Sequence, residues 1–246
     1  MHNGLKPTAP AVAASPIGKK TLCIEDLRRR ILTQAIPPGE YLDEVEVGNT
    51  YDISRPPVRE VLRQLAGEGY VVLHENRGAQ VAPMSHKTLR NFFIAAPMIY
   101  AAVAKLAALH ARPGQIEDLK YIQMRFRQAI QNGDVNARAL LNERFHAAMG
   151  EMADNEYLMP SLRRLLIDHT RIGVTFYNPR TSTMIKQQAV AADQHDQFIS
   201  LIEAGDAEAA AALAVEHWEL SRAQIESFVT PDSIQMPLGK PPGHSQ

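Results

Sequence analysis

Two groups of residues have types and spacings that suit chemistry. The first is a row of three arginines, Arg55, Arg59 and Arg63, whose four-residue spacing places them on one stripe of a helix. Arginine donates hydrogen bonds in a planar fork that fits phosphate groups and the edge of guanine. For an isolated helix, the pattern favours a surface helix with solvated charges. The flanking segments shift the balance toward a DNA-contacting helix. A neighbouring apolar stripe can pack on a core and consists of Val58, Val61, Leu62 and Leu65.

The second group is a set of histidines in the C-terminal half of the chain. Asn142 and His146 are four residues apart and share a helix face. His195 lies ten residues before Gly205 and His217 twelve residues after it. An antiparallel helical hairpin then places both side chains about 15–18 Å from the turn. Three imidazoles and an oxygen ligand suit a divalent ion, with Zn²⁺ and Ni²⁺ as the leading candidates. The alternative is three unrelated polar side chains among the nine histidines of the chain.

The composition of the chain is that of an ordinary globular protein. It has 246 residues, a net charge of −1, 45% hydrophobic residues and 22% charged residues. Contact with nucleic acid therefore has to come from a local basic patch and not from bulk charge. The single cysteine, Cys23, excludes an internal disulfide. The sequence has neither a long uninterrupted apolar run nor an N-terminal signal segment, so we expect a cytoplasmic protein with no membrane partner.

Short elements surround the arginine helix and give it a context. Residues 1–20 are rich in Ala, Pro, Gly and Ser and are predicted to be a disordered tail. A short amphipathic helix from Thr21, a turn over residues 36–40 and a second short helix over residues 43–50 lead to the arginine helix. Ser54 is the predicted N-cap of that helix.

After the arginine helix the hydrophobic period changes to two. Residues 70–74 and 79–83 are predicted strands, joined by a turn that contains a glycine. Three helices followed by a hairpin predict a winged helix-turn-helix domain over residues 21–84. Arg77 and Gly78 are expected at the tip of the wing.

From residue 85 the periodicity is helical up to about residue 229. We therefore predict a mainly α chain in which an antiparallel bundle of six to seven helices, over residues 85–229, follows the winged domain. Residues 230–246 are expected to form a second disordered tail. The predicted helices are 86–111, 114–132, 135–153, 157–177, 183–204 and 207–228.

Four segments of the N-terminal part carry a family resemblance. They are Ile-Pro-Pro-Gly-Glu-Tyr-Leu at 36–42, Ile-Ser-Arg-Pro-Pro-Val-Arg-Glu-Val-Leu-Arg-Gln-Leu at 53–65, Glu-Gly-Tyr-Val at 68–71 and Arg-Gly-Ala-Gln-Val at 77–81. Together they resemble the DNA-binding domain of GntR-type bacterial transcription regulators. One departure is the stretch from Gly48 to Asp52, which replaces a Leu- and Ala-rich second helix. The resemblance implies a homodimer on a palindromic operator, and DNA contacts at Ser54, Arg55, Pro57, Arg59, Arg63, Arg77 and Gly78.

Three segments of the helical part extend the resemblance. They are Asn-Glu-Arg-Phe-His at 142–146, Gln-His-Asp-Gln-Phe-Ile-Ser-Leu-Ile-Glu-Ala-Gly-Asp-Ala at 194–207 and Glu-His-Trp at 216–218. They resemble the all-helical FCD ligand-binding domain of the FadR-type branch of this family. In its metal-binding members an Asp and three His hold the ion, and small carboxylates often complete the coordination. The resemblance thus implies Asn142, His146, His195 and His217 as metal ligands, with the metal affinity weakened by Asn at the usual Asp position.

The resemblance also implies a small-molecule effector of the organic-acid class. The first bundle helix of the family often carries an Arg and a Glu where this chain has Ala96 and Tyr100. The Arg commonly faces the effector, so its absence disfavours a simple carboxylate. Only a neutral imidazole binds a metal, so occupancy of the site is expected to fall below about pH 6. The predicted effector pocket comprises Tyr100, Arg144, His169 and Arg171.

Two functions are compatible with these features. The first is a sequence-specific DNA-binding transcription regulator, expected to be a repressor, that responds to a metabolite in a metal-containing pocket and dimerises through its helical domain. The second is a metal-dependent helical enzyme fused to a DNA-binding module. Helical metal hydrolases carry an acid/base beside the metal, as in His-Glu-x-x-His, and the chain lacks this motif. The sequence therefore favours the regulator.

Overall fold

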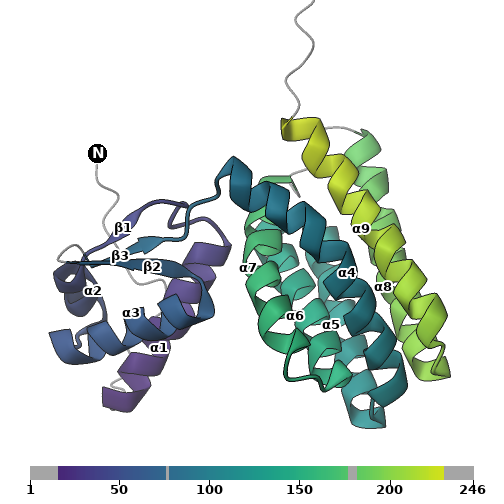
Figure 1. Ribbon diagram of the computed structural model, residues 1–246, viewed down its shortest axis with the longest axis horizontal. Coiled ribbons are helices and arrows are strands. Elements are labelled where there is room, and N and C mark those ends of the chain that lie inside the picture. Colours follow the sequence, from purple (N-terminus) through teal and green to yellow (C-terminus); the bar gives the residue numbers. More distant parts are fainter. Residues whose placement is uncertain (1–15, 76–77, 177–181, 230–246) are drawn as a thin grey trace, which may run out of the picture.

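The computed structural model describes residues 16–75, 78–176 and 182–229, and these form two lobes (Figure 1). The N-terminal lobe is a winged helix-turn-helix and the helical lobe is a bundle, which confirms the predicted fold class. The N-terminal lobe contains α1 (Pro16–Leu32), β1 (Tyr41–Leu42), α2 (Glu44–Tyr51), α3 (Arg55–Glu68), β2 (Val71–His74) and β3 (Gly78–Val81). The helical lobe contains α4 (His86–His110), α5 (Pro113–Gln131), α6 (Val135–Ala153), α7 (Leu158–Phe176), α8 (Ser182–Ala204) and α9 (Ala207–Val229).

Helix α3 is the predicted arginine helix, and all four residues of its apolar stripe are buried. Ser54 precedes it with an extended backbone, as an N-cap requires, but the Ser54 hydroxyl makes no capping hydrogen bond. The reason is local. A cap bonds to the N–H groups two and three residues further on, and here these positions are Pro56 and Pro57, which have no N–H. The Ser54 side chain is exposed and does not stabilise the N-terminus of the helix through a capping hydrogen bond.

Helix α1 begins at Pro16, so the predicted disordered tail over residues 1–20 is wrong for residues 16–20. Proline suits the first turn of a helix because the N–H that it lacks would have no partner there. Lys20 then pairs with Glu60 of α3 at 2.6 Å. Composition alone does not reveal such a tertiary contact. The remaining parts of the two predicted tails, residues 1–15 and 230–246, lie outside the described residues.

Helix α2 forms despite the glycine and asparagine that weaken it. Asp43 caps it, because its carboxylate accepts hydrogen bonds from the N–H groups of Val45 at 2.8 Å and Glu46 at 3.0 Å. Gly48 faces the chain that leads into α3, and a Cβ at this position would lie 2.9 Å from the carbonyl oxygen of Ile53. The glycine thus allows the close approach of α2 and α3. This accounts for the glycine in the stretch that departs from the Leu- and Ala-rich helix of the family.

A three-stranded antiparallel sheet completes the N-terminal lobe, in the order β1-β3-β2. Strands β2 and β3 form the predicted hairpin, with Val71 opposite Val81. Strand β1 is a difference from the prediction. It pairs Tyr41 with Gln80 of β3, and its two residues are too few to show a period of two in the sequence.

The helical lobe is built around α4, which packs against α9, α6, α7 and α8. Phe92, Ala96 and Val103 are among the residues of α4 that belong to the core of this lobe. By length and composition alone, α4 is apolar enough to cross a membrane. Packing in the bundle accounts for the buried part of that composition, which is 39% of the apolar window. Helices α8 and α9 form the predicted hairpin around Gly205.

Candidate nucleic-acid interface and candidate metal centre

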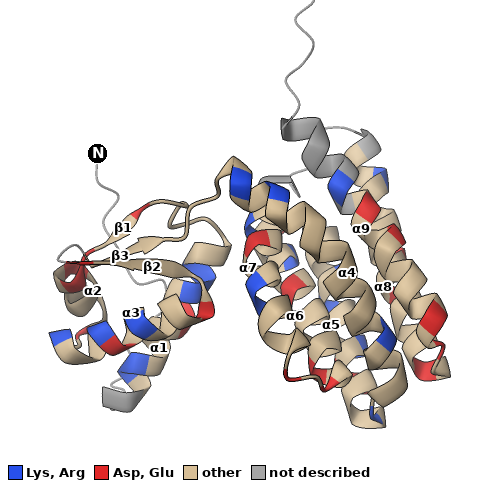
Figure 2. Cartoon of the chain, viewed as in Figure 1, with Lys and Arg blue, Asp and Glu red and all other residues tan. Residues whose placement is uncertain are grey.

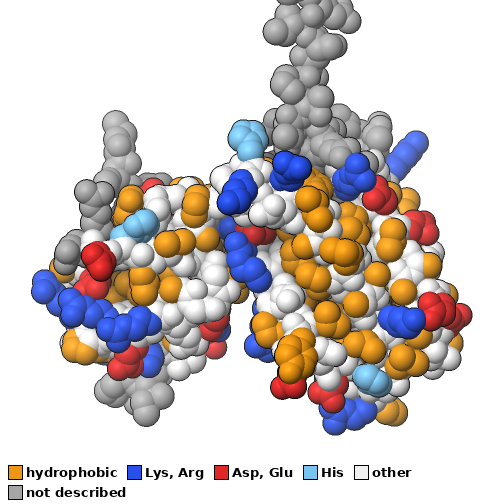
Figure 3. Space-filling view, in the orientation of Figure 1, with side chains coloured by type: hydrophobic (Ala, Val, Ile, Leu, Met, Phe, Trp, Pro, Cys, Tyr) orange, Lys and Arg blue, Asp and Glu red, His pale blue; other side chains and the backbone are white. Residues whose placement is uncertain are grey.

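The arginine row lies on the outer side of α3. Arg55, Arg59 and Arg63 are all exposed, and basic side chains follow this helix in Figures 2 and 3. A hollow of about 610 Å³ lies beside the row, between α3, the start of α2 and the β2–β3 hairpin. Arginines next to an open groove suit contact with both the backbone and the base edges of a nucleic acid.

The wing corresponds to the β2–β3 hairpin. Gly78 has a φ of +74°, and a Cβ at this position would lie 2.7 Å from the carbonyl oxygen of Leu42. The fold itself therefore requires glycine there, independently of any contact with DNA. Pro57 is partly buried in the first turn of α3. Arg77, the predicted residue at the tip of the wing, lies outside the described residues.

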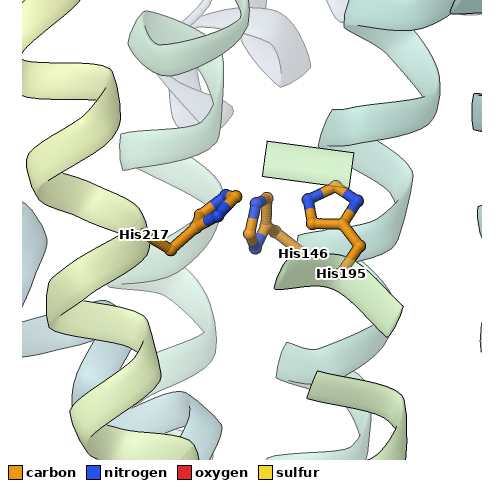
Figure 4. Close-up of side chains that lie close together, drawn as sticks. All are labelled: His146, His195 and His217. Atoms are coloured by element: carbon orange, nitrogen blue, oxygen red, sulfur yellow. The ribbon is translucent and has the colours of Figure 1, made fainter. Parts of the chain in front are cut away.

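Three histidines from three helices converge in the helical lobe (Figure 4). His146 of α6, His195 of α8 and His217 of α9 each offer a ring nitrogen within 4.8 Å of the other two. Their ring centroids are 5.1 to 5.4 Å apart. The helix spacings predict this convergence. Asn142, the fourth predicted ligand, is buried one turn before His146 on the same helix.

Two glutamines fix the hydrogen positions on two of the three rings. The side-chain oxygen of Gln123 lies 3.1 Å from Nδ1 of His195, while its amide nitrogen donates to the carbonyl oxygen of Ala192 at 2.8 Å. The side-chain oxygen of Gln194 lies 2.8 Å from Nδ1 of His217. A glutamine oxygen can only accept, so each Nδ1 carries the hydrogen and each neutral ring keeps a lone pair on Nε2. Imidazoles oriented in this way are prepared to bind a metal ion.

The cluster is buried and uncharged. Nε2 of His146 and Nε2 of His195 are buried without a hydrogen-bond partner among the described residues. Burial lowers the pKa of His217 to about 3. Burial, and after it the neighbouring imidazoles, holds the pKa values of His146 and His195 well below 6.5. The lone pair on Nε2 of His195 is thus a buried acceptor without a donor, which is costly, and a metal ion would satisfy it. The residues present therefore fit a divalent ion.

A small cavity beside the cluster brings in a fourth histidine. Tyr100 of α4 and His169 of α7 line it, and the Tyr100 hydroxyl lies 2.8 Å from Nδ1 of His169. Phe198 and Trp218 supply apolar walls. The space that a water molecule can occupy is about 10 Å³, which is room for about one water molecule. Two of the four predicted pocket residues, Tyr100 and His169, thus lie beside the three histidines.

The other two predicted pocket residues do not line this cavity. Arg144 is exposed and pairs with Glu151 at 3.0 Å. Arg171 is buried at the N-terminal lobe. Arg144 lies two residues before His146, and Arg171 two residues after His169, and both histidines line the cavity. Residues two apart on a helix are about 200° apart around its axis, so each arginine points away from the cavity. Arg144 and Arg171, which were predicted to belong to the effector pocket, therefore lie away from this cavity.

Arg171 instead connects the two lobes. Its side chain is completely buried, and its Nη1 donates to the carbonyl oxygen of Ala82, just after β3, at 2.6 Å. Its other terminal nitrogen pairs with Asp168. Gln34, just after α1, donates to the carbonyl oxygen of Arg171. Helix α7 thus carries His169 to the cavity and, on another face, a buried contact to the N-terminal lobe.

The two glutamines that orient the histidines are not among the residues predicted from the sequence. For Gln123 the sequence does hold a signal. It lies on the buried side of α5 with Leu119 and Phe126, and a polar residue at a core position needs a hydrogen-bond partner. For Gln194 no such signal exists, because its bond to His217 depends on how α8 and α9 pack.

Comparisons with known proteins match both lobes. Residues 23–81 match the family described as bacterial regulatory proteins, gntR family, and residues 98–220 match the FCD domain. The HTH-type transcriptional repressor RspR of Escherichia coli (strain K12) is 26% identical over 191 residues, which are 78% of this chain and 82% of that protein. The gluconate operon transcriptional repressor of Bacillus subtilis (strain 168) is 27% identical over 134 residues, 54% of each chain.

Solved structures share the fold. E. coli McbR/YncC has a TM-score of 0.73 and 16% identity, over 86% of this chain and 99% of that one. A putative transcriptional regulator GntR from Rhodococcus sp. RHA1 has a TM-score of 0.66 and 18% identity, over 85% of this chain and 98% of that one. At these identities the likeness concerns the fold alone, whereas the two domain matches concern the sequence. The chain belongs to the GntR family of bacterial transcription regulators, as a DNA-binding regulator with an FCD domain and not an enzyme.

Proposed function

We propose that this regulator is a homodimeric repressor that binds a palindromic operator through α3 and the wing. A small metabolite at a metal-containing site in the helical lobe then modulates the binding. The observation that carries the DNA part is the exposed row of Arg55, Arg59 and Arg63 on a helix whose opposite side is buried. The names of the relatives from E. coli and B. subtilis, both transcriptional repressors, support repression.

Replacing Arg55 or Arg59 with alanine is expected to weaken operator binding by about 1–3 kcal/mol, because each arginine supplies charged hydrogen bonds to phosphate or base. Fluorescence anisotropy with labelled operator DNA at one fixed salt concentration measures this, since phosphate contacts make the affinity strongly salt-dependent. Lys105→Ala, which removes the same charge from the helical lobe, should bind like the wild type. Wild-type affinity in both arginine variants would contradict the assignment of α3.

The metal part rests on the buried imidazoles. We infer that His146, His195 and His217 hold one divalent ion, Zn²⁺ or Ni²⁺, with Asn142 as a neutral oxygen ligand. The hydrogen bonds that His195 and His217 donate to the glutamines, and the unsatisfied buried nitrogens, support this inference. When bound, the ion would act as a Lewis acid that accepts an oxygen of the effector.

The effector is proposed to be a small organic acid bound next to the ion. Among the described residues, no Arg or Lys lines the cavity, so the ion would be its main positive charge. Tyr100 and His169 are available as hydrogen-bonding groups. Ligand pockets usually measure about 300–1,000 Å³, far more than the present cavity. Binding of a metabolite therefore requires the side chains of the wall, including Trp218, to move.

The helical lobe is the proposed dimer interface. Ile94 and Met98 lie one turn apart on α4 and are 59% and 64% exposed. A palindromic operator has two-fold symmetry, which favours a dimer with the same symmetry. Met98→Glu is expected to shift the protein from dimer to monomer at micromolar concentration, because it places a charge in an apolar contact. Analytical ultracentrifugation measures this. Tyr121→Glu, on an exposed site of α5, is the control and should remain dimeric. A monomeric wild type would contradict the proposal.

A further inference from the structure

We infer that Glu44 determines how Arg59 contacts DNA, by holding its guanidinium so that the terminal amino groups face a base edge. The inference rests on the proposed DNA-binding role of α3 and adds a specificity-determining residue to it. Glu44 belongs to α2 and is fifteen residues from Arg59 in sequence. Only the packing of α2 beside α3 brings the two side chains together.

The position of Glu44 is fixed by its own helix. It is the first residue of α2, directly after the cap residue Asp43, whose carboxylate is engaged with the N–H groups of Val45 and Glu46. The Asp43 carboxylate is therefore engaged in capping the helix, which leaves Glu44 as the carboxylate that pairs with Arg59. The Glu44 side chain is 25% exposed, in contrast with 56% for Arg59. Both side chains line the groove beside the arginine row, and the side chain of Glu44 is the more buried of the two.

The geometry of the pair leaves one edge of the guanidinium open. Nε of Arg59 lies 2.9 Å from one carboxylate oxygen of Glu44 and 3.1 Å from the other. Guanidinium has five N–H groups in a rigid plane. Among the described residues, no hydrogen bond is made by the two terminal nitrogens of Arg59. These two nitrogens form the fork that matches the N7 and O6 acceptors of guanine in the major groove.

Charge then decides between a base contact and a phosphate contact. A carboxylate close to a phosphate is repelled, whereas a base edge carries no net charge. Glu44 therefore disfavours a phosphate contact by Arg59 and favours a base contact. Among the described residues, neither Arg55 nor Arg63 forms a salt bridge, although the charge of Arg63 interacts with that of the nearby Glu60 carboxyl. Arg55 therefore remains suited to phosphate. An exposed ion pair contributes little to folding stability, which leaves recognition as the main consequence of this pair.

The test uses full-length protein and a randomised DNA library. Glu44→Gln keeps the size of the side chain and removes its charge. Glu60→Gln is the matched control, because it removes the same charge from α3, where Glu60 pairs with Lys20 at 2.6 Å. Arg59→Ala identifies the base position that Arg59 reads. Selected sites are sequenced, binding to each base variant is measured at one salt concentration, and thermal melting verifies that every variant is folded.

We expect Arg59→Ala to lose the preference for guanine at one position of each half-site. Glu44→Gln should reduce that same preference about 2- to 10-fold, which is the range expected when one oriented side chain becomes free to rotate. Its affinity for unrelated DNA should rise as much as that of Glu60→Gln, because both lose one negative charge. Wild-type base preferences in Glu44→Gln, or the same changes as in Glu60→Gln, would overturn the role of Glu44.

Two outcomes for Arg59→Ala separate this inference from the proposed function. If Arg59→Ala weakens binding equally for all sequences, Arg59 contacts phosphate, and the role of Glu44 is overturned while α3 remains the DNA-binding helix. If Arg59→Ala binds every sequence like the wild type, the assignment of α3 itself fails and the inference fails with it. Loss of guanine preference at one position in both Arg59→Ala and Glu44→Gln supports the inference.

Discussion

Replacing Arg171 with methionine is expected to lower the free energy of unfolding by about 3–5 kcal/mol, the cost of breaking a buried ion pair from one side. The guanidinium is completely buried between the lobes. Methionine occupies a similar volume but cannot donate a hydrogen bond. The carbonyl oxygen of Ala82 then loses its donor, and the buried carboxylate of Asp168 loses one of its two cations.

Arg164 provides the matched comparison for this prediction. It also pairs with Asp168, at 2.7 Å, but its side chain is 42% exposed. Water can take over much of this interaction, so Arg164→Met is expected to cost about 1 kcal/mol or less. Chemical denaturation followed by circular dichroism, and by fluorescence of Trp218, the single tryptophan, measures both variants. Equally small losses in the two would contradict the role given to Arg171.

A double variant tests whether the cost is electrostatic. Combining Arg171→Met with Asp168→Leu removes both buried charges, and buried pairs replaced as a whole by apolar residues often cost little. The double variant should therefore be more stable than the sum of the two single losses predicts. Additive losses would mean that Arg171 stabilises the protein through packing instead of charge.

The N-terminal lobe could be predicted in detail because its evidence is local. The arginines and the apolar residues of α3 alternate with a period that fixes which side is buried, and all four apolar residues are indeed buried. Prolines and glycines mark the ends of the elements. Where the prediction failed, a contact distant in sequence was responsible. Residues 16–20 are helical with Lys20 paired to Glu60, and β1 exists because it pairs with β3.

The candidate metal centre could be predicted in part. Helix spacing places His146, His195 and His217 at a similar height along the bundle, because the number of residues between each histidine and the nearest turn can be read from the sequence. The spacing does not say what surrounds them. Arg144 and Arg171 lie on the opposite sides of their helices from the cavity, and the glutamines reach the histidines from α5 and α8. Such partners depend on the rotation of each helix about its axis, which a periodic pattern does not fix residue by residue.

Protein purified without a histidine tag and incubated with Zn²⁺ or Ni²⁺ is expected to retain about one ion per chain, because three neutral imidazoles from three helices are already close together. His146→Ala and His195→Ala should each lose the ion. His169→Phe is the matched control, since His169 lines the same cavity but lies outside the group of three histidines. Elemental analysis of the four proteins gives the answer directly.

The bound ion should also raise the melting temperature, because it binds only the folded state and ties α6, α8 and α9 together. At a free ion concentration of 100 times Kd the gain is about 2.7 kcal/mol. His195→Ala also removes the stacking of His195 on Phe145, at 4.0 Å between ring centroids, and this loss lowers the melting temperature without any metal. The variants should therefore be compared by the increase in melting temperature that added metal causes in each. Asn142→Asp, which supplies an anionic ligand, should increase the rise.

Acid distinguishes two ways of losing the ion. The sequence predicts release below about pH 6 by protonation of the ligands. However, burial lowers the pKa of His217 to about 3 and holds those of His146 and His195 well below 6.5. The folded protein therefore keeps neutral imidazoles in mild acid, whereas the unfolded chain takes up protons near ~6.5. Stability should thus be complete above about pH 6.5 and fall below it, by about 1.4 kcal/mol per pH unit for each such histidine.

We therefore expect ion and fold to be lost together as the pH decreases, in one transition seen by both elemental analysis and circular dichroism. Release of the ion near pH 6 from protein that is still folded would show that the imidazoles titrate in place and that burial does not protect them. If the wild type takes up no Zn²⁺ or Ni²⁺ even at neutral pH, the three histidines serve instead as hydrogen-bonding groups of the effector cavity, and His146→Ala should then alter the effector response without altering metal content.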